Sequence, residues 1–100
     1  MADLTVISWR DIPAQVIVSG DGESARAELS DRFQKAIDAA AMKAGLVDAD
    51  AYLQEWHRES RPCGDDLERE LADEVARLEA VVTPERLRAL IRAGGKHAEP

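Results

Sequence analysis

The spacing of apolar residues changes once along this chain, near Ser30, and the change limits the folds that the chain can adopt. Before Ser30, small or apolar side chains such as Ala14, Val16 and Val18 recur at every second residue, the period of a β-strand. After Ser30, apolar side chains recur at steps of three or four residues, the period of an α-helix. Strands followed by helices in one chain favour an α+β fold.

We expect three strands in the first part of the chain, over residues 4–9, 14–19 and 25–29. Pro13, with its fixed φ, indicates a tight connection between the first two strands. Gly20 and Gly22 indicate a hairpin loop before the third, because glycine tolerates the positive φ that such loops need. Short connections favour a three-stranded antiparallel meander, which we expect to pack on helices.

Helix signals follow the strands. Ser30 is a typical N-cap, and Gly45 followed by Leu46 is typical of a Schellman ending, so the first helix is expected between them. Asp48 begins a shorter helix that carries Trp56 on its apolar face, and a linker is expected over residues 58–64.

The last third of the chain predicts a helical pair. Its first member has apolar residues at helical steps: Leu67, Leu71, Val75, Leu78 and Val82. Thr83 and Pro84 form a cap-and-proline start for its second member, which Gly94 and Gly95 end. We therefore expect an α+β core over residues 1–61 and an acidic helical extension over residues 62–100. The extension either packs back on the core or lies partly free.

Composition narrows the range of partners and compartments. A chain of 100 residues is the size of one domain. Its formal net charge of −7 disfavours nucleic acids and anionic membranes, and favours a basic or mixed-charge protein surface. Cys63 is the single cysteine, and the first residues do not resemble a signal peptide. We expect a cytoplasmic protein.

Two patterns in the sequence resemble chemical motifs, and neither predicts the corresponding chemistry. Gly20, Gly22 and Ala25 have the spacing of a dinucleotide-binding loop, but they join two expected strands and so predict a hairpin. His57 and Cys63 have neither an orienting third group nor an oxyanion hole nearby, so they do not predict a nucleophilic pair. The sequence thus contains no recognisable catalytic constellation, and we expect a non-enzymatic protein.

A metal site is not expected either. The potential ligands are His57, Cys63, Asp65 and Asp66. They lack the paired Cys and His spacing of a structural zinc site. A longer acidic run occupies the start of the third helix: Asp65, Asp66, Glu68, Glu70, Asp73 and Glu74. Its simplest interpretation is a solvated helix face, and the alternative is a docking face for a basic partner.

The candidate interaction residues lie in and after the first strand: Trp9, Arg10, Asp11 and Pro13. Core packing is the favoured role of Trp9, which leaves the strand edge and the turn over residues 10–13 as the expected docking surface. Arg10 and Asp11 form either an ion pair within the turn or a polar recognition tip. Trp56 is expected to pack the second helix onto the first.

Three segments together resemble a known family: TVISWRDIPAQVIV at residues 5–18, ELSDRFQKAIDAAAMKAGL at residues 28–46 and DAYLQEW at residues 50–56. They resemble a small bacterial family described as a virulence factor conserved domain, common in alphaproteobacteria, and the likeness covers residues 4–57. The resemblance supplies no catalytic or cofactor-binding residue. It implies an accessory subunit beside folate or corrinoid methyl-transfer enzymes of one-carbon metabolism.

Three functions follow as hypotheses. The leading one is a non-enzymatic accessory domain that binds a larger protein partner and needs no cofactor. The second is a small-molecule or cofactor binder in which Trp9, Tyr52 and Trp56 stack on a flat ring such as a folate or a corrinoid. The third and weakest is a regulator that binds nucleic acid through basic residues of the first helix: Arg32, Lys35 and Lys43.

Overall fold

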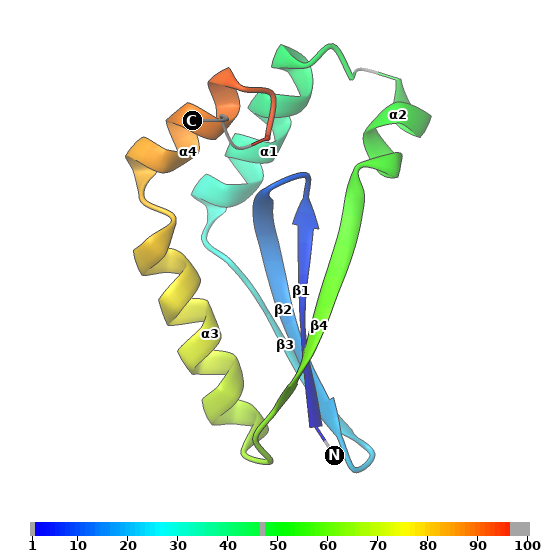
Figure 1. Cartoon of the computed structure of the whole chain (residues 1–100), viewed down its shortest axis with the longest axis vertical. Helices are drawn as coiled ribbons and strands as arrows, with labels where there is room; N and C mark the ends of the chain where they lie inside the picture. The colour runs from blue at the N-terminus through cyan, green and yellow to red at the C-terminus, as the bar shows by residue number, and fades with distance from the viewer. Residues whose placement is uncertain (1, 47, 97–100) are drawn as a thin grey trace.

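The computed structural model describes residues 2–46 and 48–96 of the chain. Its elements, in order, are β1 (Ala2–Trp9), β2 (Ile12–Gly20), β3 (Glu23–Glu28), α1 (Asp31–Lys43), α2 (Ala49–Gln54), β4 (Trp56–Cys63), α3 (Leu67–Val81) and α4 (Pro84–Arg92). The described part is therefore α+β, as the change of apolar spacing predicts. Figure 1 shows the strands crossing the lower part of the molecule and α1, α2 and α4 gathered at its upper end.

The sheet has four antiparallel strands in the order β3-β2-β1-β4, so the expected three-stranded meander is one strand short. The additional strand β4 takes up most of the segment expected to be a linker, and the expected boundary after residue 61 falls within it. β4 pairs with β1 from Ala2↔Cys63 to Trp9↔Trp56. Pro62 is tolerated because β4 is an edge strand, where a missing N–H can face solvent.

The two hairpins are tight. Asp21 and Gly22 both have positive φ, 51° and 81°, which matches the turn that joins β2 to β3 with the natural twist of the strands. The pairing of β1 with β2 shifts between Ile7 and Ser8, where Ala14 of β2 has no counterpart. This bulge lies beside Pro13 and bends the start of β2.

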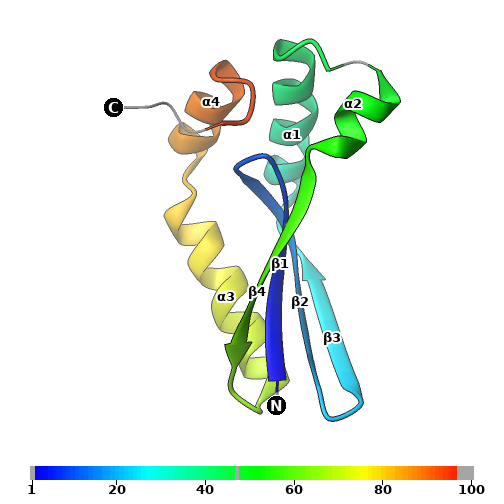
Figure 2. The same ribbon diagram turned by 45° about the vertical axis from the view of Figure 1, so that its right-hand side comes forward.

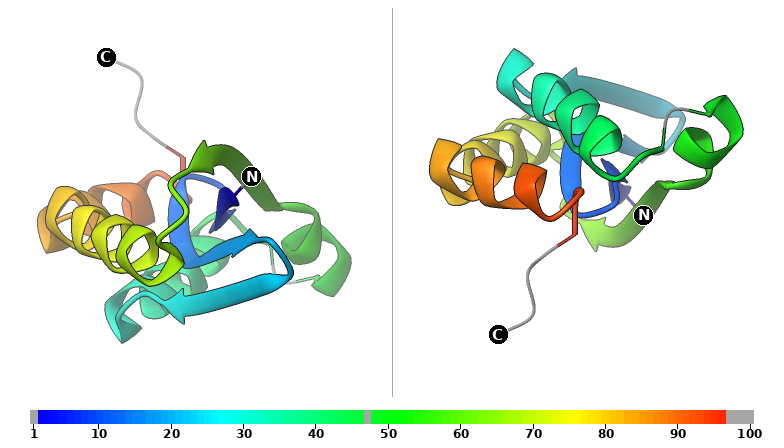
Figure 3. Two further views of the ribbon diagram at one scale, coloured as in Figure 1. Left: turned by 90° about the horizontal axis from the view of Figure 1, so that it is seen from below. Right: turned by 90° about the horizontal axis from the view of Figure 1, so that it is seen from above.

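The helices form two groups around the sheet. α3 lies along β2 and β3 on one face, while α1 and α4 pack side by side at the end where β1 turns into β2, and α1 also contacts β2 (Figures 1 and 3). The expected apolar stripe of α3 is confirmed, since Leu78 is buried in the core and the other four residues pack against it. The opposite face of the sheet is uncovered along its lower part in the described chain (Figure 2).

The helix ends follow the local signals in the sequence. Gly45, with φ 77°, donates its N–H to the Met42 carbonyl, and Leu46 donates to the Ala41 carbonyl, which is the expected Schellman ending of α1. Thr83 caps α4 by accepting from the Arg86 N–H at 3.1 Å. Ser30 stands at the N-cap of α1, but its N–H and hydroxyl both bind the Glu79 carboxylate of α3.

Candidate functional site

A row of three aromatic rings stands at the upper end of the sheet. Trp9 is fully buried, stacks on Tyr52 with 5.7 Å between ring centroids, and donates its Nε1–H to the Tyr52 carbonyl at 3.0 Å. Trp56 meets Tyr52 edge-on, with 6.1 Å between centroids. The expected core role of Trp9 is confirmed. Trp56 lies on β4 instead of on the second helix, because α2 ends at Gln54.

The turn that follows β1 is tied down on both sides. The Arg10 guanidinium lies over the Trp9 ring, donates to the Glu55 carboxylate at 2.8 Å and donates to the Gly94 carbonyl at 2.9 Å. Pro13 is buried, and Asp11 is exposed while its N–H donates to the Gly95 carbonyl. Of the four candidate interaction residues, Asp11 alone is exposed, and their role in binding a partner stays a prediction.

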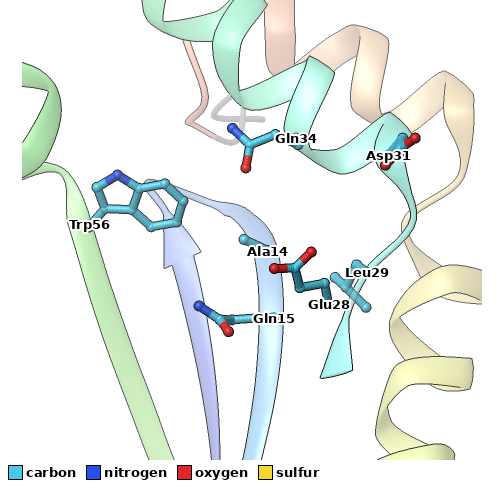
Figure 4. Close-up of a pocket in the computed structure, with 7 residues that line it drawn as sticks. All are labelled: Ala14, Gln15, Glu28, Leu29, Asp31, Gln34 and Trp56. Atoms are coloured by element: carbon cyan, nitrogen blue, oxygen red, sulfur yellow. The ribbon is translucent and has the colours of Figure 1, made fainter. Parts of the chain in front are cut away.

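A concave site opens beside the outermost ring of the row. It has a volume of about 180 Å³ and lies between β4, the β2–β3 ribbon and the first turn of α1. The Trp56 indole forms one wall, Ala14 and Leu29 lie on the apolar side, and four polar residues complete the lining: Gln15, Glu28, Asp31 and Gln34. Figure 4 shows the indole and the Glu28 carboxylate turned toward the same space from opposite sides.

Local structure places the polar side chains. Gln15 and Glu28 are partners across the β2–β3 pairing, so they project from the same face of the sheet. Asp31 and Gln34 are one turn apart on α1 and therefore share a face of that helix. Gln34 donates to the Asp38 carboxylate at 3.1 Å, which orients its amide. Within the described residues, neither Glu28 nor Asp31 forms an ion pair.

This combination of groups suits a cation. The face of an indole attracts ammonium and guanidinium groups, and a carboxylate across from it accepts their hydrogen bonds. Sequence reasoning singled out Trp56 but missed Gln15, Glu28 and Gln34. The pairing of Gln15 with Glu28 follows from the hairpin register, which was the one signal available for them.

The two residues of the possible nucleophilic pair remain apart. His57 and Cys63 stand at opposite ends of β4, about 20 Å from each other for six residues of extended chain. Burial and the neighbouring Glu70 carboxylate raise the pKa of the Cys63 thiol, which disfavours the thiolate form. Gly20 and Gly22 lie at the β2–β3 hairpin, as their simpler interpretation predicts. Across residues 2–46 and 48–96, no three His, Cys, Asp or Glu side chains gather as a metal site.

One member of the acidic run points inward, against the expectation of a wholly solvated face. Glu74 is 4% exposed and lies between α3 and β4, because it belongs to the same helical face as Leu78. Arg77 donates to both of its carboxylate oxygens, at 2.9 and 2.6 Å, and Arg61 of β4 donates to one of them at 3.2 Å. This cluster links α3 to the edge strand that sequence reasoning missed.

The contribution of Glu74 and its two arginines to stability should depend on pH. The hydrogen bonds from Arg77 outweigh burial and lower the pKa of Glu74 below its ordinary value of 4.5. The stabilisation is therefore fully present above that value and is lost as the pH falls through the lower folded-state pKa. We expect Glu74→Gln to cost about 1–2 kcal/mol at neutral pH, because the two arginines are more than half exposed and partly screened.

Urea unfolding from pH 7 to pH 3 provides the measurement. The wild type should lose more stability across this range than Glu74→Gln does, so the two curves converge at low pH. Glu68→Gln, which neutralises an exposed carboxylate on the same helix, should follow the wild type. Parallel curves for the wild type and Glu74→Gln would contradict the assignment.

Comparison with known proteins adds one finding. A family model described as "Virulence factor" matches residues 7–91. The chain belongs to this family. The match runs from the middle of β1 into α4, so it extends well beyond residue 57, where the likeness in the sequence was expected to end. The family match thus includes β4 and α3, and the family's description names no reaction.

No curated protein and no solved structure matches this Virulence factor domain. Among the described residues, no helix has the length and apolar character needed to cross a bilayer.

Proposed function

We propose that this Virulence factor domain is a non-enzymatic accessory domain that binds a basic segment of a larger protein. The observation that carries the proposal is the site beside Trp56, where the Glu28 and Asp31 carboxylates line the same concavity as the indole and have no ion-pair partner in the described chain. An arginine or lysine side chain of the partner would lie against the Trp56 ring and donate to these carboxylates.

The magnitudes support such a contact. A cation over an indole contributes about 0.5–2 kcal/mol, and a hydrogen bond to a charged group about 1.5–3 kcal/mol. The formal net charge of −7 adds a longer-range attraction that raises the rate of encounter with a basic surface. The uncovered lower face of the sheet continues from the site and offers room for the rest of the partner segment (Figure 2).

The family resemblance suggests which partners to examine first. It implies folate or corrinoid methyl-transfer enzymes of the cytoplasm, beside which the domain would act as an accessory subunit of one-carbon metabolism. The basis of this narrower proposal is the resemblance alone.

A second candidate function is binding of a flat small molecule at the same site. The aromatic row favours it, but Trp9 and Tyr52 already cover each other, so a ligand ring would have to lie on Trp56. A folate or corrinoid would meet the same carboxylates, and its own carboxylates or phosphate would be repelled by them.

Calorimetric titration with an arginine-rich peptide tests the proposed function. We expect saturable binding that Glu28→Gln/Asp31→Asn weakens about tenfold, because a charge-assisted hydrogen bond is lost. Trp56→Ala should weaken it as well and should abolish the accompanying change in tryptophan fluorescence. Folate and cobalamin, titrated in parallel, test the second candidate.

A matched control separates the site from the general charge of the domain. Glu23→Gln/Asp65→Asn removes the same two charges from exposed positions elsewhere and should leave the affinity nearly unchanged. Equal weakening by both pairs of substitutions would mean that the peptide senses only net charge, and the proposed function would fail. Saturable quenching by folate together with no peptide binding would favour the second candidate.

A further inference from the structure

A second concave surface lies on the other side of α1, between α1 and α4. Its volume is about 380 Å³. Its floor is made of small and apolar side chains: Ala36, Ala39, Pro84, Leu87 and Ile91. Its rim is basic, with Arg32 and Lys35 on α1 and Arg88 on α4, and no carboxylate lines it in the described chain. We refer to these residues as the α1–α4 groove.

The packing of the two helices explains the groove. Arg32, in the first turn of α1, donates to the Val82 carbonyl just before α4 at 2.7 Å. Gly94, just after α4, lies against Ala44, just after α1. The helices therefore run side by side in the same direction, as Figure 3 shows from above. Ala36 and Ala39 have small side chains on the side of α1 that borders α4, which leaves a furrow between the two helices.

The apolar strip continues past the groove. Met42 lies one turn beyond Ala39 on the same face of α1 and is 74% exposed, the highest value among the exposed large apolar residues that the structure describes. An exposed methionine at the end of an apolar furrow is typical of surfaces that adapt to a partner helix.

The rim charges are unusual for this domain, whose net charge is −7. Arg32 is engaged by the Glu79 carboxylate at 3.1 Å, so it contributes little free charge. Lys35 and Arg88 form no ion pair among the described residues and stand on opposite walls of the groove. Two unpaired cations facing each other across an apolar floor are complementary to an apolar stripe flanked by acids.

We infer that the α1–α4 groove docks an acidic amphipathic helix of a partner protein. Apolar residues of that helix, spaced at three or four positions, would cover the floor from Leu87 and Ile91 toward Met42. Its flanking carboxylates would bind Lys35 on one wall and Arg88 on the other. This inference goes beyond the proposed function, since it concerns a different surface and a ligand of opposite charge.

Nucleic acid is the less favoured occupant, although Arg32, Lys35 and Lys43 suggested it in the sequence. A phosphate backbone gains nothing from an apolar floor, and the acidic remainder of the domain repels it. The acidic helix uses both the floor and the rim.

The test uses a designed peptide of about four helical turns, with leucines at helical spacing and glutamates beside them. Titration should show saturable binding to the whole domain. A peptide of the same composition with its leucines moved off the helical spacing should bind at least about tenfold more weakly, because it cannot cover the floor. Equal binding of the two peptides would overturn the inference.

Charge reversal distinguishes a lost contact from a misfolded variant, because a misfolded domain would not gain affinity for a peptide of reversed charge. The Lys35→Glu/Arg88→Glu variant should bind the acidic peptide about tenfold more weakly than the wild type does. It should bind a version of the peptide with lysines in place of the glutamates more tightly than the wild type does. Arg26→Glu/Arg58→Glu, which reverses two exposed charges on the sheet, should change neither affinity substantially. Loss without rescue, an equal loss in the control, or displacement of the peptide by duplex DNA would each overturn the assignment of an acidic helix. Binding here should be insensitive to Glu28→Gln, since Glu28 lies on β3 and does not line the groove, so the two proposals can fail separately.

Discussion

Trp9→Ala is expected to lower the free energy of unfolding by about 3–5 kcal/mol, the usual cost of removing a large aromatic side chain from a core. Trp9 is fully buried and contacts Tyr52, Arg10 and Gly95. Its removal therefore leaves a cavity where the turn after β1, α2 and the segment after α4 meet. The total free energy of unfolding of a natural domain is about 5–15 kcal/mol, so the variant should be close to unfolding at ambient temperature.

Urea unfolding followed by circular dichroism measures this loss, with Trp56→Ala as the comparison. Trp56 has the same side chain but is half-buried, so its replacement should cost less than half as much. Trp9→Phe should recover most of the stability, because it restores a ring while the Nε1–H bond to the Tyr52 carbonyl stays absent. A Trp9→Ala cost of less than about 1 kcal/mol would contradict the structure.

The second large effect concerns Gly95, which is packed against the same tryptophan. A Cβ at this position would lie 2.6 Å from Cζ3 of Trp9, and the residue has φ 97°, a conformation that L side chains rarely adopt. Both the overlap and the backbone conformation oppose a side chain. Gly95→Ala should therefore destabilise the domain by about 2–4 kcal/mol.

Gly22→Ala is the matched control for Gly95→Ala. Gly22 also has a positive φ, 81°, but an added Cβ there would meet nothing within 4 Å. Gly22→Ala should therefore lower the free energy of unfolding only by the cost of placing alanine at a positive φ, about 1 kcal/mol. The difference between the two variants in thermal or urea unfolding isolates the contact with Trp9, and equal costs would show that this contact is unimportant.

Features that depend on neighbours in the sequence were predictable. The Schellman ending at Gly45 and the Thr83–Pro84 start of α4 involve residues within one or two turns, so their signals are present in the sequence itself. The apolar stripe of α3 was predictable for the same reason. The core position of Trp9 followed from the need of a small sheet for bulky residues.

Strand β4 could not be predicted in the same way. It pairs with β1, from Trp9↔Trp56 to Ala2↔Cys63, across most of the intervening chain. As an edge strand it carries mostly exposed side chains, so no alternation of apolar and polar residues marks it. Its serine and proline resemble a linker when read locally. The inward position of Glu74 was hidden for a related reason, since Arg61, one of its two partners, lies on β4.

The sequence by itself thus determined the α+β class, most of the helices and the ends of α1 and α4, because short-range periodicity and capping decide them. The tertiary structure alone decided which side chains meet. It placed Trp56 beside Glu28 and Asp31, and Lys35 across a furrow from Arg88. Both sites are formed by elements distant in the chain, and contact between such elements depends on how the sheet and helices pack, which no local pattern of residues records.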